Sequence, residues 1–397
     1  MKILFTILLS VLYSLTATAD IKFSGYGSII AGQTLGTGDD PINAGQKRDE
    51  RLVADFYDVG FYTNDVTFKA ESIFALQSEM DVGPGFKVTA QLVAKAVDDF
   101  QPEFDWYYLT YQASERLTLM AGRRNIPMYY FSEYSEVGYA YPWMRPPSNL
   151  YWWQITQFNG IHARYDFDIG EYSSAVTVFY GNEYSKDNPE MKYYEELYGN
   201  ATQSVDEIWT DILGVNWSVT GDTFDVRFVY FQNHRDRDLY RPSIVASTDG
   251  TGAVIPNQYD YVLAVTSNDP FSQTFIGVGG SVDVNMLTIL FDMNFVEYDD
   301  THGTQFPTYL LSGVYNIDKY QPYISYSKAD HKRTKGAGKT DDLEEHYILG
   351  LGVRYNFLPK ASLKVQFDHF EDEGDEASGW RYHGNSDTIT AGVDFIF

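Results

Sequence analysis

The chain has 397 residues, with 29 Lys and Arg against 55 Asp and Glu, and it contains no cysteine. A formal net charge of -26 repels a phosphate backbone, so the protein is not expected to bind nucleic acid. The lack of cysteine excludes disulfide frameworks, thiolate metal sites and cysteine nucleophiles. A chain of this length holds either two ordinary domains or one large barrel, so the hydrophobic pattern has to decide between them.

The first 19 residues have the features of an export leader. A basic start at Lys2 precedes an apolar run over residues 3–15, and Ala19 completes a small-residue cleavage site. The run is shorter than a membrane span of about 20 residues, and polar sequence follows it. We therefore expect residues 1–19 to be a signal peptide and residues 20–397 to be the exported protein.

The exported part alternates apolar and polar residues with a period of two. At the C-terminus, Ile389, Val393 and Phe397 fall on one face, while Thr390 and Asp394 fall on the other. Such alternation is typical of strands, and it recurs along the whole chain. The predicted strands are 21–32, 71–80, 86–97, 103–113, 116–124, 159–168, 172–181, 206–218, 223–232, 272–283, 286–298, 306–317, 320–330, 345–356, 361–371 and 386–397.

The connections between these strands differ in length at the two ends. Short turns lie at 82–85, 114–115, 169–171, 219–222, 283–285, 318–319 and 358–360. Most of the other connections are long and polar: 33–70, 125–158, 182–205, 233–270, 331–344 and 372–385. A soluble sandwich or propeller does not predict this asymmetry, whereas an outer-membrane barrel does. We therefore expect an all-β, transmembrane antiparallel β-barrel of 16 strands whose apolar faces point outward.

Aromatic residues near the predicted strand ends fit the girdles that such barrels place at the two membrane interfaces. These residues are Trp217, Phe224, Tyr298, Tyr320, Phe357, Phe370 and Phe397.

Three short stretches resemble the Gram-negative outer-membrane porin superfamily. The terminal Phe397 resembles the signal by which such barrels are recognised for insertion, and Gly25-Tyr26-Gly27 resembles the Tyr-Gly that opens many porins. The stretch Gly-Arg-Arg-Asn-Ile-Pro-Met-Tyr, residues 122–129, is similar to the Gly-Arg-x-x-x-Pro-x-Tyr that leads from strand five into the third loop of many porins. The chain lacks the Pro-Glu-Phe-Gly-Gly that many enterobacterial porins carry in that loop.

The resemblance implies a general diffusion porin in the outer membrane of a Gram-negative bacterium. Such a protein passes ions and small hydrophilic solutes, contacts membrane lipid and lipopolysaccharide, forms a homotrimer and needs no cofactor. Its third loop folds into the barrel and narrows the pore.

The connection over residues 125–158 agrees in position with that third loop. It follows the fifth predicted strand, and it is rich in Tyr, Trp and Pro. Such a segment can pack on itself and on the barrel wall. We expect it to fold inward as a constriction loop; the alternative is an external lid that rests on the rim.

With the apolar faces outward, the inward faces carry charges of both signs. The basic residues are Lys87, Lys95, Arg124, Arg164, Arg227, Arg354 and Lys364, and the acidic ones are Asp166, Asp225, Asp292, Asp368 and Asp394. The lumen is therefore expected to be polar and charged.

Some of these charges are candidates for the narrowest part of the pore. Lys95, Arg124 and Arg164 come from nearby strands around the base of the third loop, while Glu133 and Glu136 lie on that loop. A basic wall that faces an acidic loop would create a transverse field that orients dipolar solutes and tunes ion selectivity. The alternative is that these side chains are solvated lumen charges with no special role.

Two further arginines complete the candidate constriction. Arg145 lies on the third loop. Strict alternation points Arg123 outward, whereas the porin-like stretch places it at the pore, and a bulge near the rim would reconcile the two.

The external loops contain acidic runs such as Asp299-Asp300 and Glu371-Asp372-Glu373. These runs either hold divalent cations that bridge to lipopolysaccharide phosphates or keep the exposed surface soluble.

Hydrolase signatures are absent from the sequence: it contains no Gly-x-Ser-x-Gly, His-Glu-x-x-His or P-loop. We therefore expect no catalytic residue and no bound metal. The expected function is passive diffusion through an outer-membrane channel. A substrate-specific channel for sugars or anions stays open, because third-loop aromatics can form a slide for sugar rings. A barrel hydrolase or an adhesin is the more distant alternative.

Overall fold

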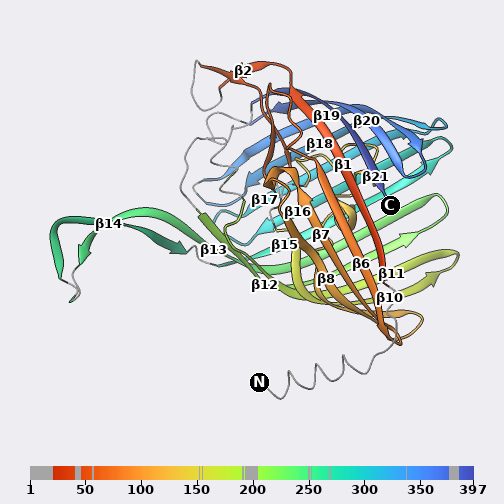
Figure 1. The fold of residues 1–397 in the computed structure, drawn as a ribbon, viewed down its shortest axis with the longest axis horizontal. Coiled ribbons are helices and arrows are strands. Elements are labelled where there is room, and N and C mark those ends of the chain that lie inside the picture. Colours follow the sequence, from red (N-terminus) through yellow and green to blue (C-terminus); the bar gives the residue numbers. More distant parts are fainter. Residues whose placement is uncertain are drawn as a thin grey trace.

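The computed structural model describes residues 21–40, 46–55, 58–151, 153, 155–189, 192, 204–248, 251, 253–267, 270–336, 338–374 and 384–397. The expected signal peptide lies outside them. Within the described residues, sixteen antiparallel strands form one closed barrel, as the sequence predicts (Figure 1). They are β1 (Ile21–Thr34), β6 (Ile73–Gly83), β7 (Phe86–Lys95), β8 (Pro102–Gln112), β9 (Leu117–Asn125), β10 (Gln157–Ile169), β11 (Tyr172–Ser185), β12 (Ser204–Thr220), β13 (Phe224–Thr248), β15 (Phe271–Val284), β16 (Leu287–Tyr298), β17 (Thr304–Tyr315), β18 (Tyr320–Arg333), β19 (Thr340–Leu358), β20 (Ala361–Asp372) and β21 (Ser386–Ile396).

The barrel closes at its first strand. β1 pairs with β21 on one edge, where Tyr26 lies opposite Ile396, and with β6 on the other, where Ile21 lies opposite Met80. These two ladders close the sheet on itself, as a barrel in lipid requires.

The faces of the strands are inverted relative to a soluble protein. On β21, Thr388, Thr390 and Asp394 point inward and are buried, whereas Ile389 points outward and is exposed. On β17, Leu311 is exposed outward in the same way. The outer surface is thus apolar over most of its height, as expected for a wall surrounded by lipid.

The short turns gather at one end of the barrel, to the right in Figure 1. Several contain a residue with positive φ, namely Gly85 (75°), Gly170 (64°), Asn285 (57°) and Asp318 (51°). Such residues allow the tight hairpins that match strand twist. The long connections lie at the opposite end.

The expected loop over residues 233–270 is largely a strand hairpin. β13 continues to Thr248 and pairs with β14 (Val254–Ser267), and the hairpin projects beyond the barrel at the left of Figure 1. The prediction ended β13 too early because charged residues from Arg235 to Asp238 break the apolar alternation. Outside the bilayer a strand needs only pairing partners, and β12 and β14 supply them.

The other loops carry short elements. The loop between β1 and β6 contains the hairpins β2 (Thr37–Asp39) with β3 (Lys47–Asp49) and β4 (Leu52–Asp55) with β5 (Gly60–Tyr62). Turns of 3-10 helix lie at η1 (Ala96–Asp98), η2 (Ser132–Tyr134) and η3 (Gly138–Ala140). In the described part of the chain, no helix is long and apolar enough to cross a membrane.

The predicted aromatic girdle is partly wrong. Trp217, Tyr320 and Phe397 are exposed near strand ends, but Phe370 and Tyr298 are buried inside the barrel. Both of these residues occupy inward positions near the long-loop end. They pack there against loops that fold into the lumen, so they are core residues and not membrane anchors.

Candidate pore constriction

Loop 3, residues 126–156, folds into the barrel and is fastened first to the wall at β13 and β16. The backbone N–H of Tyr130 donates to Asp292 Oδ2 (3.0 Å), and Arg227 donates to the Tyr130 carbonyl (3.2 Å). Asn294 donates to the other oxygen of Asp292 (3.1 Å). A buried carboxylate that receives several hydrogen bonds holds its donors firmly, so this end of the loop is fixed.

The tip of loop 3 is held by a group that we call the tip cluster: Lys364, Asp394 and Ser28. Lys364 Nζ donates to the carbonyls of Gly138 (2.6 Å) and Trp143 (2.5 Å) and pairs with Asp394 Oδ2 (2.9 Å). Ser28 Oγ donates to Asp394 Oδ1 (2.5 Å). The two charged side chains are at most 1% exposed, so their mutual attraction is weakly screened.

The tip also approaches the short-turn end of the barrel. The Arg354 guanidinium donates to the Tyr141 carbonyl (3.0 Å) and lies 4.5 Å from the ring centre of Tyr139. The Tyr139 hydroxyl donates to the carbonyl of Pro359 (2.8 Å), which belongs to the short turn between β19 and β20. Loop 3 therefore descends through much of the height of the wall.

The returning limb of loop 3 is bound to the same side of the barrel. Met144 N–H donates to Gln366 Oε1 (2.8 Å) on β20. Asn149 and Ser327 of β18 form a reciprocal pair, with the asparagine donating to the backbone carbonyl (3.2 Å) and the serine hydroxyl donating to the asparagine oxygen (2.7 Å). Loop 3 is thus an infolded loop, as expected, and not a lid on the rim.

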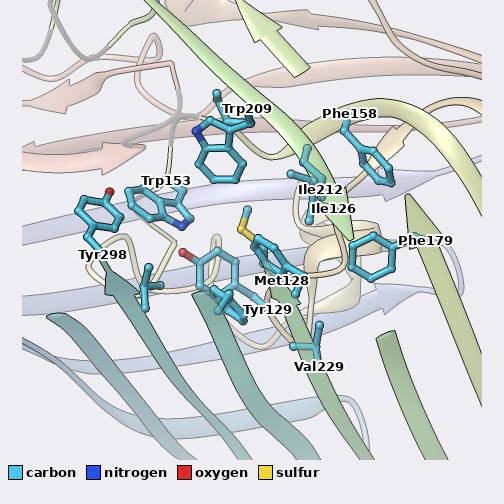
Figure 2. Packing of buried hydrophobic residues seen from close by; sticks show 14 residues of the cluster. Ile126, Met128, Tyr129, Trp153, Phe158, Phe179, Trp209, Ile212, Val229 and Tyr298 are labelled. Atoms are coloured by element: carbon cyan, nitrogen blue, oxygen red, sulfur yellow. The ribbon is translucent and has the colours of Figure 1, made fainter. Parts of the chain in front are cut away.

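Apolar side chains of loop 3 build two cores inside the lumen. In the first, shown in Figure 2, Trp153 stacks on Tyr298 with ring centres 5.9 Å apart, and Tyr129 meets Phe275 edge-on at 5.8 Å. Its members are Ile126, Met128, Tyr129, Trp153, Ile155, Phe158, Phe179, Trp209, Ile212, Val229, Phe231, Phe275, Val296 and Tyr298. The second joins Phe131, Tyr141, Trp143 and Leu150 to Leu290, Leu310, Val314 and Tyr323.

These cores change the interpretation of the aromatic residues in loop 3. Tyr141, Trp143 and Trp153 are at most 3% exposed. Because their faces are covered by other side chains, these rings do not form a slide along which sugars could pass. Trp152 lies outside the described residues.

The opposite side of loop 3 faces the wall at β7 through charged side chains. Lys95 Nζ contacts Asp58 Oδ2 of loop 1 (residues 35–72) at 2.5 Å and also contacts Glu136 Oε1 of loop 3. The hydroxyl of Tyr26 donates to Glu136 Oε2 (3.4 Å). The charged side chains are between 11% and 24% exposed, so water screens them in part.

A second, looser contact lies at β9. Arg124 approaches Glu133 Oε1 of loop 3 at 3.8 Å, and its guanidinium lies 4.8 Å from the ring centre of Tyr108. The Glu133 side chain is 51% exposed. Glu133 is therefore solvated, whereas Arg124 is 16% exposed and lies against the wall.

Arg123 lines a cleft together with Lys95 and Gln157. It donates to both oxygens of Glu183 (2.8 and 2.7 Å) and to Gln157 Oε1 (2.9 Å). The preceding Gly122 has a φ of 141°, a backbone that side-chain-bearing residues rarely adopt. The strand is therefore distorted just before Arg123.

Arg145 and Arg164 occupy different levels. Arg145 donates to the Glu71 carbonyl (3.2 Å) and lies 3.8 Å from Asp394, beside the tip cluster. Arg164 pairs with Asp166 at 2.8 Å and is 43% exposed. In the β9–β10 ladder, Arg164 lies opposite Thr118, about 20 Å along the strands from Arg124. The structure thus brings Lys95 and Arg124 to loop 3, which carries Arg145, whereas Arg123 binds Glu183 and Gln157 on the wall and Arg164 lies nearer the short-turn end.

Clefts open between loop 1 and loop 3. The first, which we call the loop cleft, is lined by Ala54, Ala70, Glu71, Ser72, Ile73, Lys95, Val97, Ser135, Glu136, Arg145, Pro146, Ser148, Tyr151 and Thr156. The adjoining one, which we call the recess, shares Ala54, Glu71, Arg145, Pro146 and Ser148 with it. Sequence reasoning missed Asp58 and Glu71, because loop 1 has neither a motif nor a periodic pattern that would mark them.

Among the described residues, no group of three or more His, Asp or Glu side chains is arranged to hold a metal ion.

Comparison with known proteins now places the chain. The profile of the Gram-negative porin family matches residues 6–375. The chain belongs to the Gram-negative porin family. This porin is therefore an outer-membrane diffusion channel of a Gram-negative bacterium and not an enzyme. No curated protein sequence matches it significantly.

Solved porins share the fold. OmpT of Vibrio cholerae, in its trimer form, has 11% identity and a TM-score of 0.52, with 96% of this chain and 99% of OmpT covered. The anion-selective porin of Comamonas acidovorans has 11% identity and a TM-score of 0.54, with 96% of this chain and 100% of that porin covered. OmpF of Salmonella typhi in complex with daunomycin has 13% identity and a TM-score of 0.56, with 95% of this chain and 97% of OmpF covered.

Proposed function

We propose that ions and small hydrophilic solutes cross this porin between loop 3 and the wall formed by β6–β9, with loop 1 at the mouth. The observation that carries the proposal is the contact of Lys95 with both Glu136 and Asp58, which brings loop 3, the wall and loop 1 to one level. On the other side, loop 3 packs against β13 and β15–β18 through two buried cores, which leave little room for solutes.

The narrowest part is formed by Lys95 and Arg124 on the wall and by Glu133 and Glu136 on the loop. Their opposite charges lie in contact or nearly so at the edge of the path, where their field orients a dipolar solute as it passes. Arg123 and Arg145 line clefts at the margin of this level. Arg164 contributes a charge to the wider lumen below.

The same proposal includes a homotrimer that contacts lipid and lipopolysaccharide. It is supported by the trimer form of OmpT and by an apolar outer surface that suits both lipid and a neighbouring barrel. The acidic external runs are solvated loop surface in this proposal, and divalent cations between them and lipopolysaccharide phosphates are not required.

Single-channel recording in a planar bilayer tests the conduction path. The purified mature protein should give current steps grouped in threes, and the reversal potential under a KCl gradient reports the ion preference. A folded, heat-modifiable protein that never conducts would contradict the proposed path. Steps that are always single would contradict the trimer alone.

A further inference from the structure

The recess between loops 1 and 3 ends on buried polar side chains. Its lining consists of Leu52, Ala54, Tyr62, Glu71, Trp143, Arg145, Pro146, Pro147, Ser148, Ser325, Ile348, Gln366, Asp368 and Thr390. Trp143 is 1% exposed and Thr390 is 2% exposed. Among the described residues, neither Trp143 Nε1 nor Thr390 Oγ1 has a hydrogen-bond partner. Buried polar groups are usually satisfied by protein or by water, so these two atoms mark positions for a water molecule or a solute hydroxyl.

The polar groups belong to one patch of the wall. Thr390 on β21 lies directly opposite Gln366 on β20, and Gln366 Nε2 donates to Asp368 Oδ2 (2.6 Å). A Cβ placed on Gly350 would lie 2.5 Å from Ser325 Oγ and 2.9 Å from Asp368 Oδ1. These two oxygens therefore pack closely against the bare backbone of Gly350, where a side chain would not fit.

The charges around the recess disfavour an anion. Asp368 and Glu71 both line it. Arg145 is the one basic residue in the lining, and its guanidinium donates to the carbonyls of Met144 (2.7 Å) and Glu71 (3.2 Å) and lies 3.8 Å from Asp394. An anion would thus meet two carboxylates and an arginine that is already engaged.

The hydrogen-bonding groups of the recess distinguish between a cationic and a neutral ligand. The indole of Trp143 can only donate, the Asp368 carboxyl accepts in its ionised form, and the Thr390 hydroxyl can donate and accept. An ammonium group satisfies the acceptor but not the indole. An alcohol group satisfies all three, because each hydroxyl both donates and accepts.

The remaining lining suits the carbon skeleton of such a ligand. Leu52, Pro146 and Ile348 provide apolar contacts, and the Tyr62 ring adds an aromatic one. Mixed walls with a few converging polar groups are typical of small-molecule sites. We infer that the recess is a subsite for the hydroxyl-bearing edge of a neutral polyhydroxylated solute, a sugar or polyol, whose remainder lies in the loop cleft. The inference rests on the proposed conduction path, because the loop cleft opens onto it.

Current noise in planar bilayers tests the subsite, with glucose and sorbitol as probes and triethylene glycol as a size-matched solute with few hydroxyls. We expect glucose or sorbitol to produce saturable excess noise and the glycol to produce none. Propylammonium chloride is the probe for a cation in the same place. Noise from the ammonium salt without noise from the polyols would overturn the assignment, and so would silence from every probe in a conducting channel.

Two variants locate the effect. Thr390→Val and Trp143→Phe should each raise the half-blocking polyol concentration roughly fivefold, the effect of one ordinary hydrogen bond. Thr308→Val is the matched control, because Thr308 is also buried in the barrel with no partner for its hydroxyl among the described residues, yet it does not line the recess. An equal response of Thr390→Val and Thr308→Val would contradict the site.

A binding measurement separates this inference from the proposed path. Equilibrium dialysis of radiolabelled glucose against the detergent-folded protein does not depend on current. Binding that is weakened by Thr390→Val, in a protein that does not conduct, would retain the subsite and reject the path. Normal conduction with no binding would retain the path and reject the subsite.

Discussion

The two sides of loop 3 differ in how they meet the barrel. Toward β13–β21 the loop is joined by backbone hydrogen bonds, two aromatic cores and the buried Lys364–Asp394 pair. Toward β7 and β9 it makes the partly exposed contacts of Lys95 and Arg124 with loop carboxylates.

The difference shows how one loop serves two purposes. Charges that are removed from water hold their geometry strongly, because a buried charge without its partner is costly. Charges that keep part of their contact with water interact more weakly with one another and remain within reach of passing ions. The same types of side chain are therefore structural on one side and suited to conduction on the other.

A deletion within loop 3 removes parts of both its sides at once, so it should have the largest effect on conduction. Deletion of Tyr130–Trp143 should raise single-channel conductance severalfold. The variant would lose apolar side chains that fill the lumen and the two loop carboxylates of the narrowest part. The matched control removes the same number of residues, Val254–Ser267, from the hairpin that projects beyond the barrel. Unchanged conductance after the first deletion, or an equal rise after both, would argue against a loop-lined pore.

Stability measurements should separate the two sides next. Lys364→Met leaves Asp394 buried without its amine, and we expect the free energy of unfolding to fall by about 3–5 kcal/mol. Lys95→Met removes an amine from a less deeply buried site and should lower it by a smaller amount, about 1–2 kcal/mol. Urea unfolding of vesicle-inserted protein, followed by tryptophan fluorescence, measures both.

Similar losses in these two variants would remove the distinction between a structural and a functional side. Adding Asp394→Leu to Lys364→Met serves as a further check, because replacing both charges should recover part of the loss.

The smallest expected effect is a change in ion selectivity. Its size at each residue shows how close that residue lies to the narrowest part of the path. Arg124→Glu should shift the permeability ratio toward cations by roughly fivefold, which corresponds to about 1 kcal/mol between charges 4 Å apart in water. Arg164→Glu should shift it less, because Arg164 lies in the wider lumen beside Asp166. Reversal potentials under a KCl gradient measure both variants. A larger shift for Arg164→Glu would place the narrowest part nearer the short turns.

Alternation in the sequence was sufficient to predict the barrel. A period of two with apolar faces outward placed Lys364, Asp292 and Asp394 in the lumen, and all three are there. It failed where lipid no longer sets the pattern, as in the charged part of β13. At Phe370 the alternation correctly points inward, and the error was to interpret an aromatic residue at a strand end as a membrane anchor. An inward aromatic residue near a strand end looks like a membrane anchor until the loop that covers it is known.

The candidate site was predictable only in part. The motif near Gly122 located loop 3, and its acidic residues Glu133 and Glu136 followed from position. Alternation could not show that Lys364 is buried beneath the loop tip while Lys95 stays partly solvated, because this depends on where loop 3 docks. Glu71 and Asp58 come from a loop without periodicity, so their approach depends on tertiary structure alone.

The tip cluster also constrains the order in which the molecule can assemble. Lys364, which pairs with Asp394 in the last hairpin, donates to the carbonyls of Gly138 and Trp143, more than 220 residues earlier in the chain. Contacts between such distant residues form late, since the intervening chain must first be brought together. Loop 3 can thus be locked only after the final strands have arrived, so an incompletely translocated chain would have no secured constriction.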